Sequence, residues 1–310
     1  VLFGWVATRR GGMVFAMITL GLGEMIAASA LMLPGFFGGE GGISANRVVG
    51  APLLGITYGP ALEVYGLIAA WTLAAAAAIY ALTRTPLGRI ANAVRDNAER
   101  AAFVGYDARR VRFMMFVAAS FFAGISGGLA AVLFEIVNAE SVGIARSGAV
   151  LLATFIGGTG HFLGPVLGAI VYTFFVLAVA GWTKAWLLYL GLFFVAMVLY
   201  APGGLAGILA ANWRAWRSGE GASLGAPYAI AGAAALPAAA GVALLVELAY
   251  QARLDAGAPL RFGSIALDTT AVAPWLIGVA MTACGVLLCV PAFRRVRGAW
   301  DAIDARVARI

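Results

Sequence analysis

The chain has 310 residues, of which 63% are hydrophobic and 11% charged, and its mean hydropathy is +0.94. This composition excludes the soluble globular class. The formal net charge of +7 is typical of some nucleic-acid-binding proteins, but the basic residues lie between apolar runs, so we expect them to set membrane topology and we expect no nucleic-acid partner.

Eight apolar runs follow one another along the sequence, and most approach the roughly 20 residues that a helix needs to cross the hydrocarbon core. We therefore predict an all-α fold, a polytopic transmembrane helical bundle in the membrane of a cell. The fourth run is short enough to be a half-span or a re-entrant segment. The runs cover residues 13–33, 61–82, 113–134, 147–160, 162–181, 186–201, 228–250 and 274–293.

Glu24 lies inside the first run, with no basic residue within one helical turn. An ionisable group in the hydrocarbon core is costly. Two interpretations stay open: Glu24 lines or gates a transport pathway, or its side chain makes an interhelical hydrogen bond. Glu63, Glu135 and Glu247 lie near the ends of their runs, where a carboxylate can reach the membrane interface.

The segment 34–60 is predicted to be external and is rich in glycine, which indicates turns or an outer mouth that receives substrate. A phosphate-binding role for this glycine-rich segment is not expected. Lys184 is the only lysine, so the sequence has no GxxxxGK[ST] loop and the chain cannot be its own ATPase.

A basic segment, residues 84–112, separates the second and third runs and contains seven arginines, which marks the cytoplasmic face. Thr85 before Pro86 predicts a helix start, Gly105 a left-handed helix end, and Asp107 the cap of the next helix. The resulting short amphipathic helix either docks onto a partner or rests on lipid headgroups. Its expected apolar face is Ile90, Ala93, Val94, Ala101 and Ala102, and its expected i,i+4 ion pairs are Arg95/Glu99 and Asp96/Arg100.

A glycine-rich break follows the fourth run and forms a second candidate pathway element, since non-helical backbone at membrane depth needs protein or a water cavity beside it. Pro165 would break or kink a helix there. His161, the only histidine, is interpreted either as part of this element or as a hydrogen-bonded structural residue. The candidate pathway or gate residues are therefore Glu24, Gly157, Gly158, Gly160, His161 and Pro165.

Two glycine pairs, Gly124/Gly128 and Gly164/Gly168, stand four residues apart in apolar runs and predict close helix packing within the subunit rather than at a dimer interface. Cys284 and Cys289 stand five apart in one run, with no other ligand nearby, which indicates packing residues rather than a disulfide or a metal pair. The sequence shows no catalytic constellation, so we expect no enzyme activity, cofactor or metal.

Charge counting orients the chain. If all eight runs cross, sixteen of the 21 basic residues fall on one side, which the positive-inside rule assigns to the cytoplasm together with the C-terminus. The five basic residues on the other side are Arg47, Arg146, Lys184, Arg253 and Arg261.

The C-terminal third is predicted to contain three parts. Residues 210–227 have the composition of a cytoplasmic linker, 228–293 form an extra transmembrane hairpin, and 294–310 form a basic amphipathic tail. Trp300, Ile303, Val307 and Ile310 recur at helical spacing, so we expect the tail to lie on the inner membrane surface.

The string ERAAFVG at 99–105 resembles the ExAAxxxG loop with which the permeases of ABC importers contact their ATPases. The longer string from Gly88 to Val111 resembles the branched-chain amino-acid (LIV-type) permeases in particular. The likeness extends from about Arg9 to Leu209, within the predicted permease domain, residues 1–209. Four further motifs occur in the same order: TLGLGEM at 19–25, GGEGGIS at 38–44, FIGGTGHFLGP at 155–165 and YAPGGLAGIL at 200–209.

This resemblance implies a permease subunit that forms half of a translocation pore in the inner membrane of a bacterium. The implied partners are a second permease subunit, two cytoplasmic ATPase subunits that hydrolyse ATP, a periplasmic substrate-binding protein and the lipid bilayer. The implied substrates are branched-chain or other small hydrophobic amino acids. The ATPase-coupling residues it implies are Arg95, Glu99, Ala101, Ala102 and Gly105.

Other interpretations stay open at this point. Related permeases carry urea or short amides, and intramembrane Glu24 and Glu63 would suit an ion-driven secondary transporter. A membrane subunit without a pore is a third possibility. Members of the family carry spans ahead of the first one here, and Val1 is not methionine, so we expect a truncated N-terminus and a minimum span count.

Overall fold

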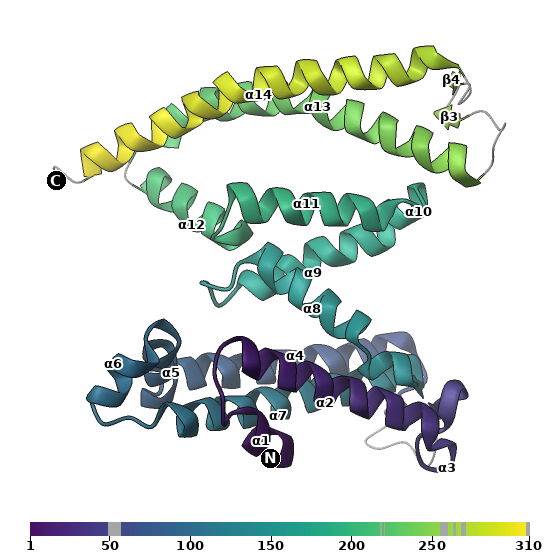
Figure 1. The fold of residues 1–310 in the computed structure, drawn as a ribbon, viewed down its shortest axis with the longest axis vertical. Helices are drawn as coiled ribbons and strands as arrows, with labels where there is room; N and C mark the ends of the chain where they lie inside the picture. Colours follow the sequence, from purple (N-terminus) through teal and green to yellow (C-terminus); the bar gives the residue numbers. More distant parts are fainter. Residues whose placement is uncertain are drawn as a thin grey trace. The chain divides into compact units, whose positions relative to one another are not determined.

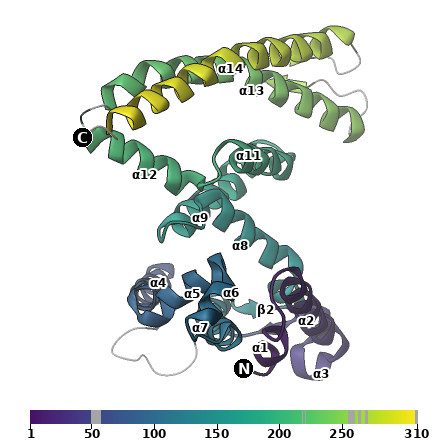
Figure 2. The same cartoon turned by 60° about the vertical axis from the view of Figure 1, so that its left-hand side comes forward.

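The computed structural model describes residues 1–48, 57–217, 219, 221–254, 260–262, 265–267 and 271–307. The chain is built almost entirely of helices joined by short turns (Figure 1 and Figure 2). It divides into two compact units, Val1–Ala149 and Val150–Ile310, and the boundary falls inside α8 (Ile144–Gly157). The predicted all-α, polytopic fold class is confirmed.

Three long apolar helices form the frame of the first unit: α2 (Met13–Met32), α4 (Ala61–Arg84) and α7 (Ala108–Phe134). Phe15 of α2 meets Phe116 of α7 edge to face, with ring centroids 6.2 Å apart. α4 also packs against α7. The shorter helical elements of this unit are α1 (Leu2–Ala7), α3 (Pro34–Phe37), η1 (Gly39–Gly41), α5 (Pro86–Asp96), α6 (Ala98–Phe103) and η2 (Ala139–Val142).

A two-stranded antiparallel ladder joins the loop after α2 to the loop after α7. It pairs β1 (Ile43–Ser44) with β2 (Ile136–Val137). Beside it, the Glu135 carboxylate accepts a hydrogen bond from the Arg47 backbone N–H at 3.1 Å and lies 3.6 Å from the Arg47 guanidinium. The C-terminal ends of α2 and α7 therefore lie at the same end of the unit, as expected for two helices that cross a membrane in the same direction.

The second unit begins with a helical stretch interrupted by one π-helical segment: α9 (Gly164–Phe174), η3 (Phe175–Val179) and α10 (Ala180–Trp182). α11 (Trp186–Tyr200) and α12 (Gly204–Arg217) follow, with a bend of 49° between them. The unit ends with a hairpin of two long, packed helices, α13 (Gly221–Leu254) and α14 (Val272–Val307), joined through the β3–β4 ladder (Figure 1). That ladder pairs β3 (Leu260–Phe262) with β4 (Ile265–Leu267).

The span count differs from the eight runs of the sequence. Within the described ranges, six helices are long and apolar enough to cross a membrane, or seven if the bent pair α11–α12 is one span. The difference lies in the fourth run, because α8 has only 14 residues. At about 1.5 Å per residue it covers roughly 21 Å, less than the ~30 Å hydrocarbon core.

The C-terminal parts are also more helical than their composition indicated. Residues 210–217 continue α12, and 221–227 already belong to α13, so little of the expected linker is left. The basic tail continues α14 without a break as far as Val307. Ile303 is 4% exposed and packs with Ala215 and Leu224, so burial inside the unit, rather than the membrane surface, covers this apolar face. The Val307 side chain and Ile310 lie outside the described residues.

The hairpin is attached to the preceding helices by side-chain contacts. The Tyr189 hydroxyl of α11 donates to the Glu247 carboxylate of α13 at 3.0 Å. Glu247 was expected to reach the membrane interface; in the structure its carboxylate accepts this hydrogen bond from Tyr189. Tyr200 of α11 meets Phe293 of α14 edge to face, with ring centroids 5.4 Å apart. Cys284 and Cys289 are both free thiols.

Candidate functional site

The basic segment between α4 and α7 folds as two helices joined at Asn97. Thr85 caps α5 as predicted: its side-chain oxygen accepts a hydrogen bond from the Gly88 N–H at 3.3 Å, and Pro86 occupies the first helical position. Asn97 has an extended backbone, ends α5, and caps α6 by accepting from the Arg100 N–H at 2.8 Å. The single amphipathic helix of the sequence-based prediction is therefore two.

The break at Asn97 corrects the predicted ion pairs of this segment. The i,i+4 pairs Arg95/Glu99 and Asp96/Arg100 require one continuous helix, and the extended residue between them removes that geometry. Arg95 instead pairs with its neighbour Asp96, Nε to Oδ1, at 3.1 Å. Both side chains are about two-thirds exposed, at 66% and 68%, so this pair adds little to stability and Glu99 is left exposed for another partner.

The turn out of α6 confirms two local predictions. Gly105 adopts the left-handed region, with φ +92°, and its N–H donates to the Ala102 carbonyl at 2.9 Å. The Asp107 carboxylate then caps α7, accepting from the N–H groups of Arg109 at 2.8 Å and Arg110 at 3.3 Å. The chain thus reverses over residues 104–107 and enters the next long helix with its first amides satisfied.

The two short helices pack on the start of α7 and leave an apolar tip exposed. Val94, Ala101 and Val111 form a small buried cluster, at 5–7% exposed. Phe103 is 85% exposed and Val104 72%. Large apolar side chains this exposed, held on a loop that has its own core, are typical of a surface that contacts another protein.

The predicted coupling residues take different places on this loop. Ala101 is buried and serves the loop's own core, whereas Arg95, Glu99, Ala102 and Gly105 are exposed. Sequence reasoning gave no separate role to Phe103 and Val104. A signal was present, because both are apolar but lie outside the helical spacing of the predicted apolar face.

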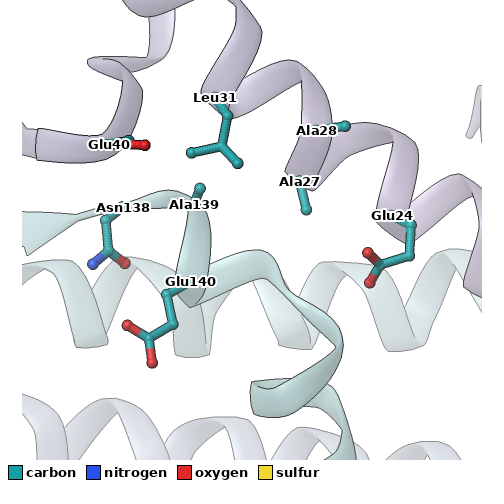
Figure 3. Close-up of a pocket in the computed structure, with 8 residues that line it drawn as sticks. All are labelled: Glu24, Ala27, Ala28, Leu31, Glu40, Asn138, Ala139 and Glu140. Carbon is teal, nitrogen blue, oxygen red and sulfur yellow. The ribbon is translucent and has the colours of Figure 1, made fainter.

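The second candidate site is a pocket of about 470 Å³ beside Glu24 (Figure 3). Glu24, Ala27, Ala28 and Leu31 recur at helical spacing and form one face of α2. In Figure 3, Leu31 faces Ala139 of η2 across the pocket, with Glu24 at one end and Glu40 with Asn138 at the other.

The pocket is strongly acidic on its inner surface. Three carboxylates line it, from Glu24, Glu40 and Glu140, and none of its eight lining residues is basic. Asn138 has a structural role, because its side-chain oxygen accepts from the Ser141 N–H at 3.1 Å and the Ser141 hydroxyl at 2.9 Å, which holds η2. Sequence reasoning missed Glu40 and Glu140, which lie 100 residues apart and meet only in three dimensions.

The glycine-rich break at 157–165 is a place of close backbone contact. A β-carbon on Gly157 would overlap the Gly164 carbonyl oxygen, and one on Gly168 would overlap the Ala153 carbonyl oxygen. A β-carbon on Gly158 would likewise overlap the Gly203 carbonyl oxygen. Two interruptions in helical structure, 158–163 and 201–203, therefore pack directly on each other.

The candidate pathway residues of the break differ in their burial. Gly157 and Gly158 are buried at the backbone contact, and Pro165 lies in the first turn of α9. A β-carbon on Gly160 would meet no described residue within 4 Å, and exposed His161 lines a hollow beside α12. The predicted close approach at Gly164 and Gly168 is confirmed, whereas Gly124 and Gly128 meet nothing within 4 Å among the described residues.

No group of three or more His, Cys, Asp or Glu side chains among the described residues is arranged to hold a metal ion. Glu63, considered above as a proton site, accepts hydrogen bonds from the backbone N–H groups of Thr57 at 3.0 Å and Tyr58 at 2.8 Å. These contacts give Glu63 a structural role at the start of α4.

The basic two-helix loop thus lies between two long apolar helices and reverses at Gly105. A family model described as "Branched-chain amino acid transport system / permease component" matches residues 1–202. The chain belongs to this permease family. It is accordingly a multi-pass membrane protein of a transport family.

Two curated relatives carry the same description. They are the high-affinity branched-chain amino acid transport system permease proteins LivM of Escherichia coli (strain K12) and Salmonella typhimurium. They are 28% and 27% identical to this permease over 225 residues, which cover 66% of its chain and 53% of each relative. The chain thus spans about half the length of the curated relatives it matches. No solved structure matches it.

Proposed function

We propose that this permease forms half of the translocation pore of an ATP-driven importer for branched-chain or other small hydrophobic amino acids. The exposed tip of the two-helix loop carries the proposal: Phe103 and Val104 protrude beside Glu99 from a loop fixed by its own core. A rigid, partly apolar projection between two spans is suited to receive a movement from a cytoplasmic protein and to transmit it along α4 and α7.

The complex in this proposal has four kinds of component. A second permease subunit completes the pore, two separate ATPase subunits bind the two-helix loops in the cytoplasm, and a periplasmic binding protein delivers substrate to the outer ends of α2 and α7. The two permease subunits lie in the bacterial inner membrane. ATP-driven closure of the ATPases would shift the loops and switch the pore between outward and inward access, as a two-state element biased at a distance.

Glu24 is the proposed pathway residue. Its side chain is exposed on α2, a helix long and apolar enough to cross the membrane. An ionised side chain that faces lipid is expensive, so this face should line a water-filled pathway or meet the second subunit. The three carboxylates favour a cationic group such as a substrate ammonium, and Ala27, Ala28 and Leu31 favour an aliphatic side chain.

The experiment that tests the function is leucine uptake into proteoliposomes. The permease would be reconstituted with the proposed second permease, ATPases and binding protein, sought in the neighbouring reading frames. We expect uptake to require ATP, the binding protein and this chain. Uptake driven by a proton or sodium gradient without ATP would refute the proposal in favour of a secondary transporter.

A Glu24→Gln variant in the same assay should raise the KM for leucine by about tenfold, the equivalent of one charge-assisted contact worth about 1.4 kcal/mol. Glu24→Asp, which keeps the charge, is the matched control and should retain most of the uptake. Both complexes should assemble in normal yield. If Glu24→Gln instead prevented assembly while Glu24→Asp did not, Glu24 would be a structural residue at the subunit interface.

A further inference from the structure

A groove of about 660 Å³ lies where the bent pair α11–α12 meets the C-terminal hairpin, within the second unit. Its walls are apolar, with Met197 and Tyr200 from α11, Ile208 and Ala211 from α12, and Phe293 from α14. The family model ends at residue 202, so most of this groove is built from the part of the chain that the family match leaves unexplained. A groove of this size is within the range of small-ligand sites.

The polar groups at the rim of the groove satisfy one another. The Trp300 indole N–H donates to the Tyr228 hydroxyl at 3.1 Å, and that hydroxyl donates to the Asn212 side-chain oxygen at 3.1 Å. This chain of hydrogen bonds ties α14, α13 and α12 together. The Tyr228 hydroxyl and the Trp300 indole N–H therefore donate to protein partners rather than to a ligand. Arg297 is the charged residue among those that line the groove.

Arg297 is an exposed cation in the groove lining. Its guanidinium lies 5.8 Å from the centre of the Phe293 ring, and among the described residues no carboxylate oxygen comes within 4.0 Å of it. Four other arginines lie on the same two helices, α12 and α14, which the buried cluster of Ala215, Leu224 and Ile303 brings together. They are Arg214 and Arg217 of α12 and Arg294 and Arg295 of α14.

We propose that this groove binds an anionic phospholipid, with its phosphate at Arg297 and an acyl chain along α11 and α12. The combination of apolar walls and an exposed cation matches an amphiphile with a negative headgroup. A soluble anion would gain nothing from the apolar walls, and a zwitterionic lipid would gain less from the Arg297 guanidinium. The groove lies between α14, which is long and apolar enough to cross the membrane, and the bent pair α11–α12, which reaches that length as one span, so such a lipid can enter from the bilayer. The hairpin then completes a lipid site at this end of the unit.

Native mass spectrometry of the purified full chain in detergent tests this proposal, with phosphatidylglycerol and phosphatidylcholine as probes. We expect phosphatidylglycerol to be retained in preference to phosphatidylcholine. Arg297→Gln should weaken its retention about fivefold, the factor equivalent to the approximate contribution of one basic residue near an anionic lipid. Arg295→Gln removes the same charge from the same helix outside the groove lining and should leave retention nearly unchanged.

A second variant probes the acyl-chain part without altering charge. Ala211→Phe should fill the groove and lower phosphatidylglycerol retention, while the melting temperature in lipid-free detergent reports that the chain is folded. Equal retention of both lipids, or equal weakening by Arg297→Gln and Arg295→Gln, would overturn the proposal and leave only general surface charge. The measurement requires neither substrate nor ATPase, so its failure would not bear on the proposed transport function.

Discussion

Phe103→Asp in the two-helix loop should abolish the coupling of ATP hydrolysis to uptake while the permease still inserts into the membrane. Phe103 is 85% exposed in the chain alone. If an ATPase groove covers it, its burial contributes about 1.5–3 kcal/mol, so losing it should weaken ATPase binding at least about tenfold. Pull-down of the ATPases and substrate-stimulated ATP hydrolysis in the reconstituted complex would be measured together.

Three further variants show which property of the loop matters. Phe103→Leu keeps an apolar side chain and should retain most of the coupling. Gly105→Val places a β-branched residue at φ +92°, which costs about 1–2 kcal/mol and should disturb the reversal that positions the tip. Glu99→Arg inverts an exposed charge and should weaken the contact without affecting the fold. Normal ATPase association in Phe103→Asp, Gly105→Val and Glu99→Arg together would show that the loop is only a topology signal.

Gly168→Leu should prevent the second unit from folding. A β-carbon there overlaps the Ala153 carbonyl oxygen, so the α8–α9 contact cannot form without moving backbone. Overpacking of this kind typically costs about 1–3 kcal/mol, and more where backbone rather than a flexible side chain must move. We expect loss of the monodisperse protein peak and a melting temperature in detergent that falls by many degrees, or no cooperative melting at all.

Gly160→Ala is the matched control for this substitution. Gly160 belongs to the same glycine-rich break, but a β-carbon there meets nothing within 4 Å among the described residues. Its melting temperature should stay within a few degrees of the parent protein. If Gly168→Leu melted like Gly160→Ala, the close contact between α8 and α9 would be refuted.

Glu24 shows how much of the proposed pathway site can be predicted from the sequence. An unpaired carboxylate in an apolar run is visible without a structure, because the cost of charge in hydrocarbon makes it exceptional. Its companions Glu40 and Glu140 are ordinary loop residues in the sequence. They gain meaning only when the β1–β2 ladder and η2 bring the loop after α7 next to α2.

The sequence by itself determined the membrane class, the all-α fold and the local geometry of the two-helix loop. These follow from composition and from contacts between residues a few positions apart: the caps at Thr85 and Asp107 and the left-handed Gly105. The break at Asn97 is local too, but an asparagine within a helical pattern fits either a break or a continuous helix, so the predicted i,i+4 pairs were wrong.

Only the tertiary structure decided what depends on distant segments. Three features each join residues 40 or more positions apart. They are the close contact of two helix interruptions at Gly158 and Gly203, the hydrogen bond from Tyr189 to Glu247, and the groove at Arg297. Such contacts are set by how helices pack, and many packings bury the same apolar residues equally well. Hydrophobic periodicity therefore fixes which residues are helical and apolar, whereas close backbone approach and buried hydrogen bonds fix which helices meet.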